Sequence, residues 1–344
     1  MKELTYTRAT DAASAVAAVG SDPDAAFLGG GTNLVDHLKL GITTPTALVD
    51  VSRLGAQEIE QVDSPDGPVL RIGAGVPNSD LAAHPVVRAR FPVVARALLA
   101  GASGQIRNQA TTGGNLLQRT RCVYFQDLST PCNKREPGTG CSALEGYGRY
   151  NAVLGVSESC VAAHPSDLAV ALAAVDAVVV VLGPGGERRV PLVDLHRLPG
   201  HQPERDTVLG HGDLVTAVDL PLRELARRST YRKTRDRASY AFALVSVAAC
   251  VELADDGTLA DLRIAWGGMA HKPWRAEVAE AALRGRVPTE DLVREAVDEE
   301  LAVAVTGPES EYKLALVRAT TALALRDLTR DDPTSATTPK DESR

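Results

Sequence analysis

The sequence has no long apolar segment of the kind that spans a membrane or directs export. No apolar run approaches the roughly 18 residues of a membrane helix, and the opening stretch MKELTYTRATDAAS lacks the apolar core of a signal peptide. We therefore expect no membrane span and a protein that is cytoplasmic by its own sequence. Export to the periplasm with a signal-bearing partner stays open.

An excess of positive charge is also absent, since the net charge is −7 from 37 basic and 44 acidic residues. Residues 227–237 (RRSTYRKTRDR) are locally basic. A solvated helix or strand face explains such a run more simply than contact with nucleic acid. We expect no nucleic-acid partner.

The two common phosphate-binding signatures, G-x-G-x-x-G and G-x-x-x-x-G-K-[ST], are missing. Residues 29–33 (GGGTN) instead follow a predicted strand and precede a predicted helix. Backbone amides of such a run can hold a phosphate, although a tight structural turn explains the run equally well. A second such segment, 108–117 (NQATTGGNLL), also presents bare amides to an oxygen-rich anion. Together they indicate one long ligand held from both sides.

Paired C-x-x-C motifs are missing too, which argues against a zinc finger or ribbon. Five cysteines occur, and the cluster of four, Cys122, Cys132, Cys141 and Cys160, favours metal over disulfides in a reducing compartment. Four thiolates on an irregular loop suit a [4Fe-4S] cluster; a zinc ion on the same thiolates and four buried thiols are the alternatives. We expect Cys250, in an apolar strand, to be a core residue.

The chain of 344 residues exceeds the usual size of a single domain. Hydrophobic periodicity and glycine or proline breaks predict its helices and strands. The predicted strands are 4–8, 25–28, 46–50, 69–73, 176–183, 214–221, 242–253 and 259–266, and the longer predicted helices are 11–20, 92–100, 274–283, 289–305 and 309–328. Residues 329–344 are polar and predict a disordered tail.

Five motifs together resemble one family, the FAD-binding medium subunit of molybdenum hydroxylases, which includes xanthine dehydrogenases and carbon monoxide dehydrogenases. They are FLGGGTNL (27–34), IRNQATTGGNL (106–116), HPSDL (164–168), the Lys233 segment and WGGMAHKPWRA (266–276). The resemblance covers about residues 2–328. One branch of this family carries a cysteine-bearing insert at the point that corresponds to about residues 119–161 of this chain. The chain therefore looks closest to the iron-sulfur-bearing flavin subunit of periplasmic-type aldehyde oxidoreductases.

The resemblance implies an α+β fold. Residues 1–222 would form a vanillyl-alcohol-oxidase (PCMH)-type FAD-binding domain of two α/β subdomains, with an iron-sulfur insert at about 119–161. Residues 223–328 would form a small C-terminal α+β domain. It places the FAD pyrophosphate on the first glycine segment and the other flank of FAD on the second. The implied cofactor residues are Phe27, Leu28, Gly29, Gly30, Gly31, Thr32, Asn33, Leu34, Thr111, Gly113, Gly114, Asn115, Asp167 and Lys233.

Two of these residues also have a physical rationale. The Asp167 carboxylate would accept hydrogen bonds from ribityl or ribose hydroxyls, and Lys233 would stabilise the anionic reduced ring. The alternative for Asp167 is a charge at a helix N-terminus, with Ser166 as the cap. We assign no catalytic acid or base, because the flavin carries the chemistry.

The implied function is that of an electron-transfer subunit with FAD and a [4Fe-4S] cluster. The partners would be a large subunit with a molybdenum cofactor, a small subunit with [2Fe-2S] clusters, and an external electron acceptor. Two alternatives are a free-standing flavin oxidase and a non-enzymatic scaffold stabilised by zinc. The sequence identifies neither the organic substrate nor the acceptor.

Overall fold

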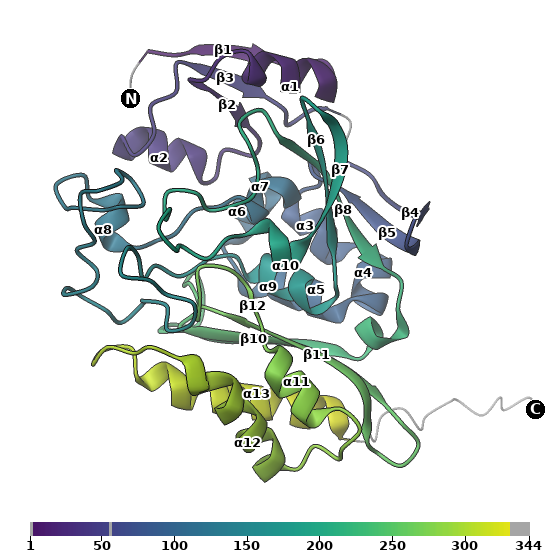
Figure 1. The fold of residues 1–344 in the computed structure, drawn as a ribbon. Helices are drawn as coiled ribbons and strands as arrows, with labels where there is room; N and C mark the ends of the chain where they lie inside the picture. The colour runs from purple at the N-terminus through teal and green to yellow at the C-terminus, as the bar shows by residue number, and fades with distance from the viewer. Residues whose placement is uncertain (1–2, 55–56, 331–344) are drawn as a thin grey trace, which may run out of the picture.

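The computed structural model describes residues 3–54 and 57–330, and it contains three sheets with helices packed around them (Figure 1). Most of the predicted tail, 331–344, lies outside the described residues. Within these ranges no helix is both long and apolar enough to cross a membrane.

The first sheet is parallel, with the strand order β1-β3-β2. Its strands are β1 (Thr5–Arg8), β2 (Ala25–Leu28) and β3 (Ala47–Asp50). Helix α1 (Ala12–Gly20) begins in a capping box, in which the Asp11 carboxylate accepts a hydrogen bond from the Ser14 amide at 2.7 Å. Helix α2 (Leu34–Leu40) follows the glycine run and stops at Gly41 in the left-handed region, φ 74°.

The second sheet is antiparallel, with the order β4-β5-β8-β6-β7. Its strands are β4 (Ile59–Ser64), β5 (Gly67–Gly73), β6 (Val178–Gly183), β7 (Gly186–Pro191) and β8 (Leu214–Pro221). The neighbouring helices are α3 (Asn78–Ala83), α4 (Pro85–Arg90), α5 (Pro92–Ala100), α9 (Asp167–Ala174) and α10 (Leu192–Leu195). From Leu168 onward every residue of α9 is buried, so this helix is the centre of the core.

Between α5 and α9 runs the segment with the second glycine run and the four clustered cysteines. Its helices are short: α6 (Gly104–Gln109), α7 (Thr112–Leu116) and α8 (Val123–Gln126). The sequence predicted this glycine run as a turn, but in the structure it forms part of α7. The Thr111 hydroxyl caps α7 by accepting a hydrogen bond from the Gly114 amide at 3.2 Å. Beyond α8 the segment is mostly turns, and it lies at the left of Figure 1.

The third sheet has the order β12-β11-β10-β9 and is buried on both faces. Its strands are β9 (Ser229–Thr234), β10 (Val245–Leu253), β11 (Leu259–Gly267) and β12 (Trp274–Arg275), preceded by η1 (Glu224–Arg227). Helices α5 and α9 cover one face. The other face carries α11 (Glu277–Leu283), α12 (Glu290–Glu300) with η2 (Leu301–Val303), and α13 (Tyr312–Thr329) (Figure 1). Cys250 is fully buried on the α9 side, as predicted.

Several predicted boundaries in this part are wrong. The helix expected at 274–283 begins at Glu277, because Trp274 pairs with Trp266 as strand β12. The helix expected at 289–305 ends at Glu300 in a 3-10 turn. The helix expected at 309–328 spans Tyr312–Thr329, so Thr329 belongs to α13 and not to a tail.

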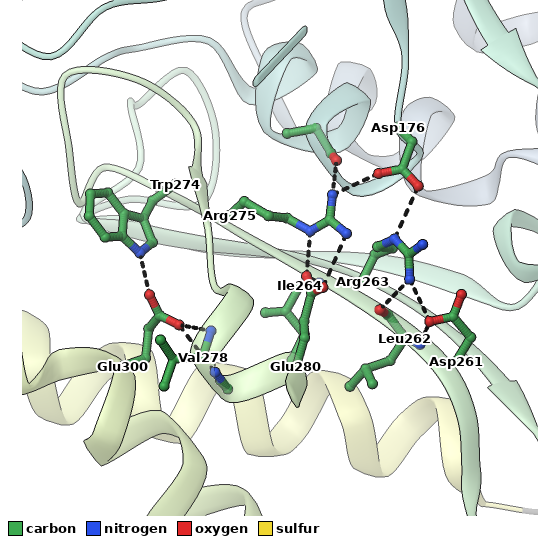
Figure 2. Close-up of polar contacts among 12 residues, drawn as sticks. Asp176, Asp261, Leu262, Arg263, Ile264, Trp274, Arg275, Val278, Glu280 and Glu300 are labelled. Carbon is green, nitrogen blue, oxygen red and sulfur yellow. Dashed lines mark hydrogen bonds and ion pairs between the residues drawn. The ribbon is translucent and has the colours of Figure 1, made fainter. Parts of the chain in front are cut away.

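An ion-pair network joins the end of α9 to the third sheet (Figure 2). The Asp176 carboxylate binds Arg275 at 2.8 Å and Arg263 at 3.0 Å, and Arg275 also binds Glu280 of α11. Asp176 holds a positive φ of 54°, which is uncommon for a residue other than glycine. The network therefore fixes the α9 terminus relative to β11, β12 and α11.

Candidate cofactor site

A cavity of about 630 Å³ is lined by both glycine segments, the HPSDL segment and β9. Its volume falls within the roughly 300–1,000 Å³ usual for small-molecule and cofactor sites. The cavity brings together six of the predicted cofactor residues from four separate stretches of sequence. They are Thr32, Asn33, Gly114, Asn115, Asp167 and Lys233.

The two glycine segments also contact each other directly. Gln109 donates a hydrogen bond to the Gly30 carbonyl at 3.2 Å. Two residues beyond the second glycine segment, the Arg119 amide donates to the Asn33 side chain at 2.9 Å. A Cβ on Gly30 would lie 2.0 Å from the Gln109 carbonyl oxygen, so only glycine fits there. The absence of a side chain at Gly30 is thus required by the chain's own packing.

The other predicted cofactor residues do not line the cavity. They are Phe27, Leu28, Gly29, Gly30, Gly31, Leu34, Thr111 and Gly113. Some of them support its wall: Thr111 caps α7, and a Cβ on Gly113 would lie 3.0 Å from the Ala74 Cβ.

Asp167 lies in the first turn of α9 with Ser166 as the cap, as the alternative reading predicts, and it also belongs to a polar cluster. Ser166 caps α9 by accepting a hydrogen bond from the Ala169 amide at 3.0 Å, and its hydroxyl also donates to Asn115 at 2.7 Å. The Asp167 carboxylate binds the Lys233 ammonium at 2.7 Å and accepts a hydrogen bond from the Tyr231 hydroxyl at 2.5 Å. Burial and the Asp167 charge raise the pKa of Tyr231 well above its ordinary value.

The basic run at 227–237 is only partly a solvated face. Its middle forms β9, where Ser229, Thr230 and Tyr231 are buried. The Lys233 side chain is 3% exposed and turns toward the cavity, where it meets Asp167.

The four clustered cysteines line one smaller cavity. Cys132 and Cys141 face each other as an isolated antiparallel bridge, and all four are free thiols. Across the described ranges, no set of three or more His, Cys, Asp or Glu side chains is arranged to hold a single metal ion. Four thiols are a donor set found both in zinc sites and in iron-sulfur clusters.

The two cavities share a wall, since Cys122 and Ala162 line both. Arg121, Val123, Tyr147 and Tyr150 of the same segment also line the larger one. Sequence reasoning did not identify Arg121 or the tyrosines, because it treated the cysteine-bearing segment only as a cluster site. The adjacency of Arg121 to Cys122 was the available signal.

The buried His196 and His271 and the partly buried His164 were also missed as a group. The rings of His164 and His196 lie 4.3 Å apart between centroids, and His164 lines the larger cavity. Burial lowers the pKa of His196 to about 4 and of His271 to about 3, and that of His164 falls well below its ordinary value. The folded protein therefore holds these imidazoles neutral.

Comparison with known families defines the class of protein as a flavoprotein subunit of an oxidoreductase. Residues 2–223 match the FAD binding domain in molybdopterin dehydrogenase, and residues 229–328 match the CO dehydrogenase flavoprotein C-terminal domain. The chain belongs to the FAD-binding medium subunits of the molybdenum hydroxylase family. The predicted family and the α+β fold are thereby confirmed.

Individual relatives agree with this assignment. The chain is 51% identical over 329 residues to the aldehyde oxidoreductase FAD-binding subunit PaoB of Escherichia coli (strain K12), covering 95% of this chain and 98% of the relative. It is 26% identical over 313 residues to the carbon monoxide dehydrogenase medium chain of Hydrogenophaga pseudoflava, covering 88% of each chain.

Solved structures show the same fold. A carbon monoxide dehydrogenase from Hydrogenophaga pseudoflava, which lacks the Mo-pyranopterin moiety of its cofactor, superposes with a TM-score of 0.72 at 25% identity, over 94% of this chain and 96% of that one. Quinoline 2-oxidoreductase from Pseudomonas putida 86 shares the fold with a TM-score of 0.72 at 21% identity, over 96% and 98% of the two chains.

Proposed function

We propose that this chain is the electron-transfer subunit of an aldehyde oxidoreductase and carries both FAD and a [4Fe-4S] cluster. Its partners would be a large subunit with a molybdenum cofactor and a small subunit with [2Fe-2S] clusters, with electrons leaving to an external acceptor. The observation that carries the proposal is the pair of adjoining cavities, one lined by predicted cofactor residues and the other by four cysteines. The name of the relative at 51% identity supports aldehydes as the substrate class.

The larger cavity fits FAD in size and in the chemistry of its lining. The first and second glycine segments would hold the pyrophosphate from two sides, with Thr32, Asn33, Gly114 and Asn115 at the wall. Bound FAD would supply the redox chemistry, and the chain binds and orients it. Lys233 would place positive charge near the ring, held in position by Asp167.

The smaller cavity fits an iron-sulfur cluster in its donor set. Cys122, Cys132, Cys141 and Cys160 would each contribute one thiolate. Because Cys122 also lines the larger cavity, the cluster would lie next to the flavin. That neighbourhood supports electron exchange between the two, although a structural role for the cluster would use the same ligands.

We also propose the domain division given by the sequence, 1–222 with an insert at about 119–161, followed by 223–328. The two family matches, which meet between residues 223 and 229, support this division. The Asp176 network would then be an interdomain contact (Figure 2).

The visible absorption spectrum of the purified chain tests both cofactors at once. Flavin bands above a broad iron-sulfur shoulder are the expected result. Flavin bands alone would favour the free-standing oxidase, and a colourless protein that contains zinc would favour the scaffold.

Co-expression with candidate partner subunits tests the subunit role. We expect a stable complex that co-purifies with this chain. Robust aldehyde turnover by the isolated chain would instead show that it carries its own substrate site, and the subunit proposal would fail.

A further inference from the structure

We propose that Arg121 binds the pyrophosphate of FAD, so that the cysteine-bearing segment supplies a ligand to the flavin site. This inference rests on the proposed function, in which the larger cavity holds FAD. It extends that proposal, because the segment would then serve both cofactors.

Arg121 is held at the wall of the larger cavity by its neighbours. It immediately precedes Cys122, and its guanidinium donates to the Arg119 carbonyl. The guanidinium carbon also lies 5.0 Å from the ring centroid of Phe242. Stacking and one hydrogen bond fix the plane of the group while its other N–H donors stay available to a ligand.

Among the basic side chains that line the cavity, Lys233 is held in an ion pair, whereas Arg107 and Arg237, like Arg121, donate to backbone carbonyls. Lys233 pairs with Asp167, and Arg107 donates to the Gly101 carbonyl at 2.6 Å. Arg237 donates to the Tyr240 carbonyl at 2.9 Å.

Arg121 has no carboxylate partner within ion-pair distance among the described residues, and its side chain is partly buried. A partly buried cation with no ion-pair partner is costly, and an anionic ligand would lower that cost.

The position of Arg121 favours the phosphates over the flavin ring. Two residues before it, the Arg119 amide is bonded to the Asn33 side chain at 2.9 Å, so this part of the segment is tied to the first glycine segment. Thr32 and Asn33 line the same cavity as Arg121. The planar fork of a guanidinium also matches phosphate oxygens through paired hydrogen bonds.

The test is the FAD dissociation constant of the iron-loaded chain, measured by flavin fluorescence for the parent, Arg121→Gln, Arg121→Lys and the exposed control Arg88→Gln. We expect Arg121→Gln to weaken FAD binding by about tenfold or more, the size of one charge-assisted hydrogen bond. Arg121→Lys should fall between it and the parent, because lysine keeps the charge and loses the fork. Arg88→Gln should bind FAD like the parent.

A second measurement distinguishes a contact with the phosphates from a contact with the flavin ring. At saturating FAD, the absorption spectrum of the bound flavin should be the same in Arg121→Gln and the parent. An unchanged dissociation constant in Arg121→Gln, or a shifted flavin spectrum at saturation, would overturn the inference. If Arg121→Gln loses iron or does not fold, Arg121→Lys decides, and parent-like FAD affinity there would overturn it. A parent chain that binds no FAD would instead refute the proposed function.

Discussion

The buried pair of Asp167 and Lys233 is the most informative contact at the scale of single residues. The Lys233 side chain is 3% exposed and that of Asp167 is 11% exposed, so neither charge is well solvated without the other. Each therefore depends on its partner for stability as well as for any role in holding a cofactor.

Removing both members of this pair should destabilise the protein less than the two single losses added together. We expect Lys233→Met to lower the free energy of unfolding by about 3 kcal/mol, because it leaves a buried carboxylate without its cation. The double variant Asp167→Asn/Lys233→Met should lose less than the sum of the single variants. Urea unfolding of the FAD-free chain measures the stability of the parent, the two single variants and the double variant. Additive losses would mean that the two charges do not interact.

Gly30 illustrates how packing changes the meaning of a substitution. The family resemblance places the FAD pyrophosphate on the first glycine segment, whereas the structure shows that a Cβ added at Gly30 would lie 2.0 Å from the Gln109 carbonyl oxygen. Loss of FAD in Gly30→Val would therefore not isolate a phosphate contact.

We expect Gly30→Ala to destabilise the FAD-free chain by about 1–3 kcal/mol, the usual cost of overpacking. Gly104→Ala is the matched control, because an added Cβ there meets nothing within 4 Å. The melting temperature of Gly104→Ala should equal or exceed that of the parent. Equal melting temperatures for Gly30→Ala and the parent would show that the two glycine segments can separate without cost.

At the scale of elements, the cysteine-bearing segment has few regular hydrogen bonds of its own and is anchored by side chains. Phe125 is fully buried in it and packs edge-on to His37 at 5.7 Å between ring centroids. Arg135 donates to the carbonyls of Tyr124 and Phe125 at 2.8 and 2.9 Å. A cluster bound to four points of the segment would add order to these contacts.

Replacing any one of the four clustered cysteines by serine should lower the iron content and expose residues 122–160 to protease. The physical reason is that one missing ligand leaves an open iron corner in a cooperative site. Iron analysis and limited proteolysis measure the two effects, with Cys250→Ser as the internal control because Cys250 is a core residue of β10. Parent-like iron in all four variants would show that the cluster assignment is wrong.

At the scale of the whole molecule, the neutral imidazoles of His164, His196 and His271 should make the fold sensitive to acid. Their pKa values are lowered in the folded state, whereas the unfolded chain has an ordinary histidine pKa of roughly 6.5. Between that value and about pH 4 the unfolded state binds more protons, so the free energy of unfolding falls as the pH falls.

We expect His196→Gln to reduce this pH dependence by up to about 1.4 kcal/mol per pH unit, the contribution of one proton. Urea unfolding at pH 5 and pH 7 measures the difference. His201→Gln, at an exposed position, should keep the slope of the parent. Identical slopes for His196→Gln and the parent would mean that His196 is protonated in the folded state.

The sequence by itself determined the family and the order of most helices and strands, and it predicted the two sets of site residues. These depend on local patterns, such as apolar periodicity in α5 and β6, a glycine run after β2 and four cysteines in one segment. The predicted start of α11 was wrong, because Trp274 pairs with Trp266 as strand β12 and this pairing competes with helix formation.

Only the tertiary structure decided which of these residues meet. The pairing of Asp167 with Lys233, the fit of Gly30 against Gln109 and the shared position of Cys122 at both cavities each join parts of the chain that are distant in sequence. Arg121 became a candidate ligand of FAD in the same way. In the described ranges no carboxylate lies within ion-pair distance of it, and this follows from how its surroundings pack. Such contacts follow from how helices and sheets pack, and local sequence carries no record of them.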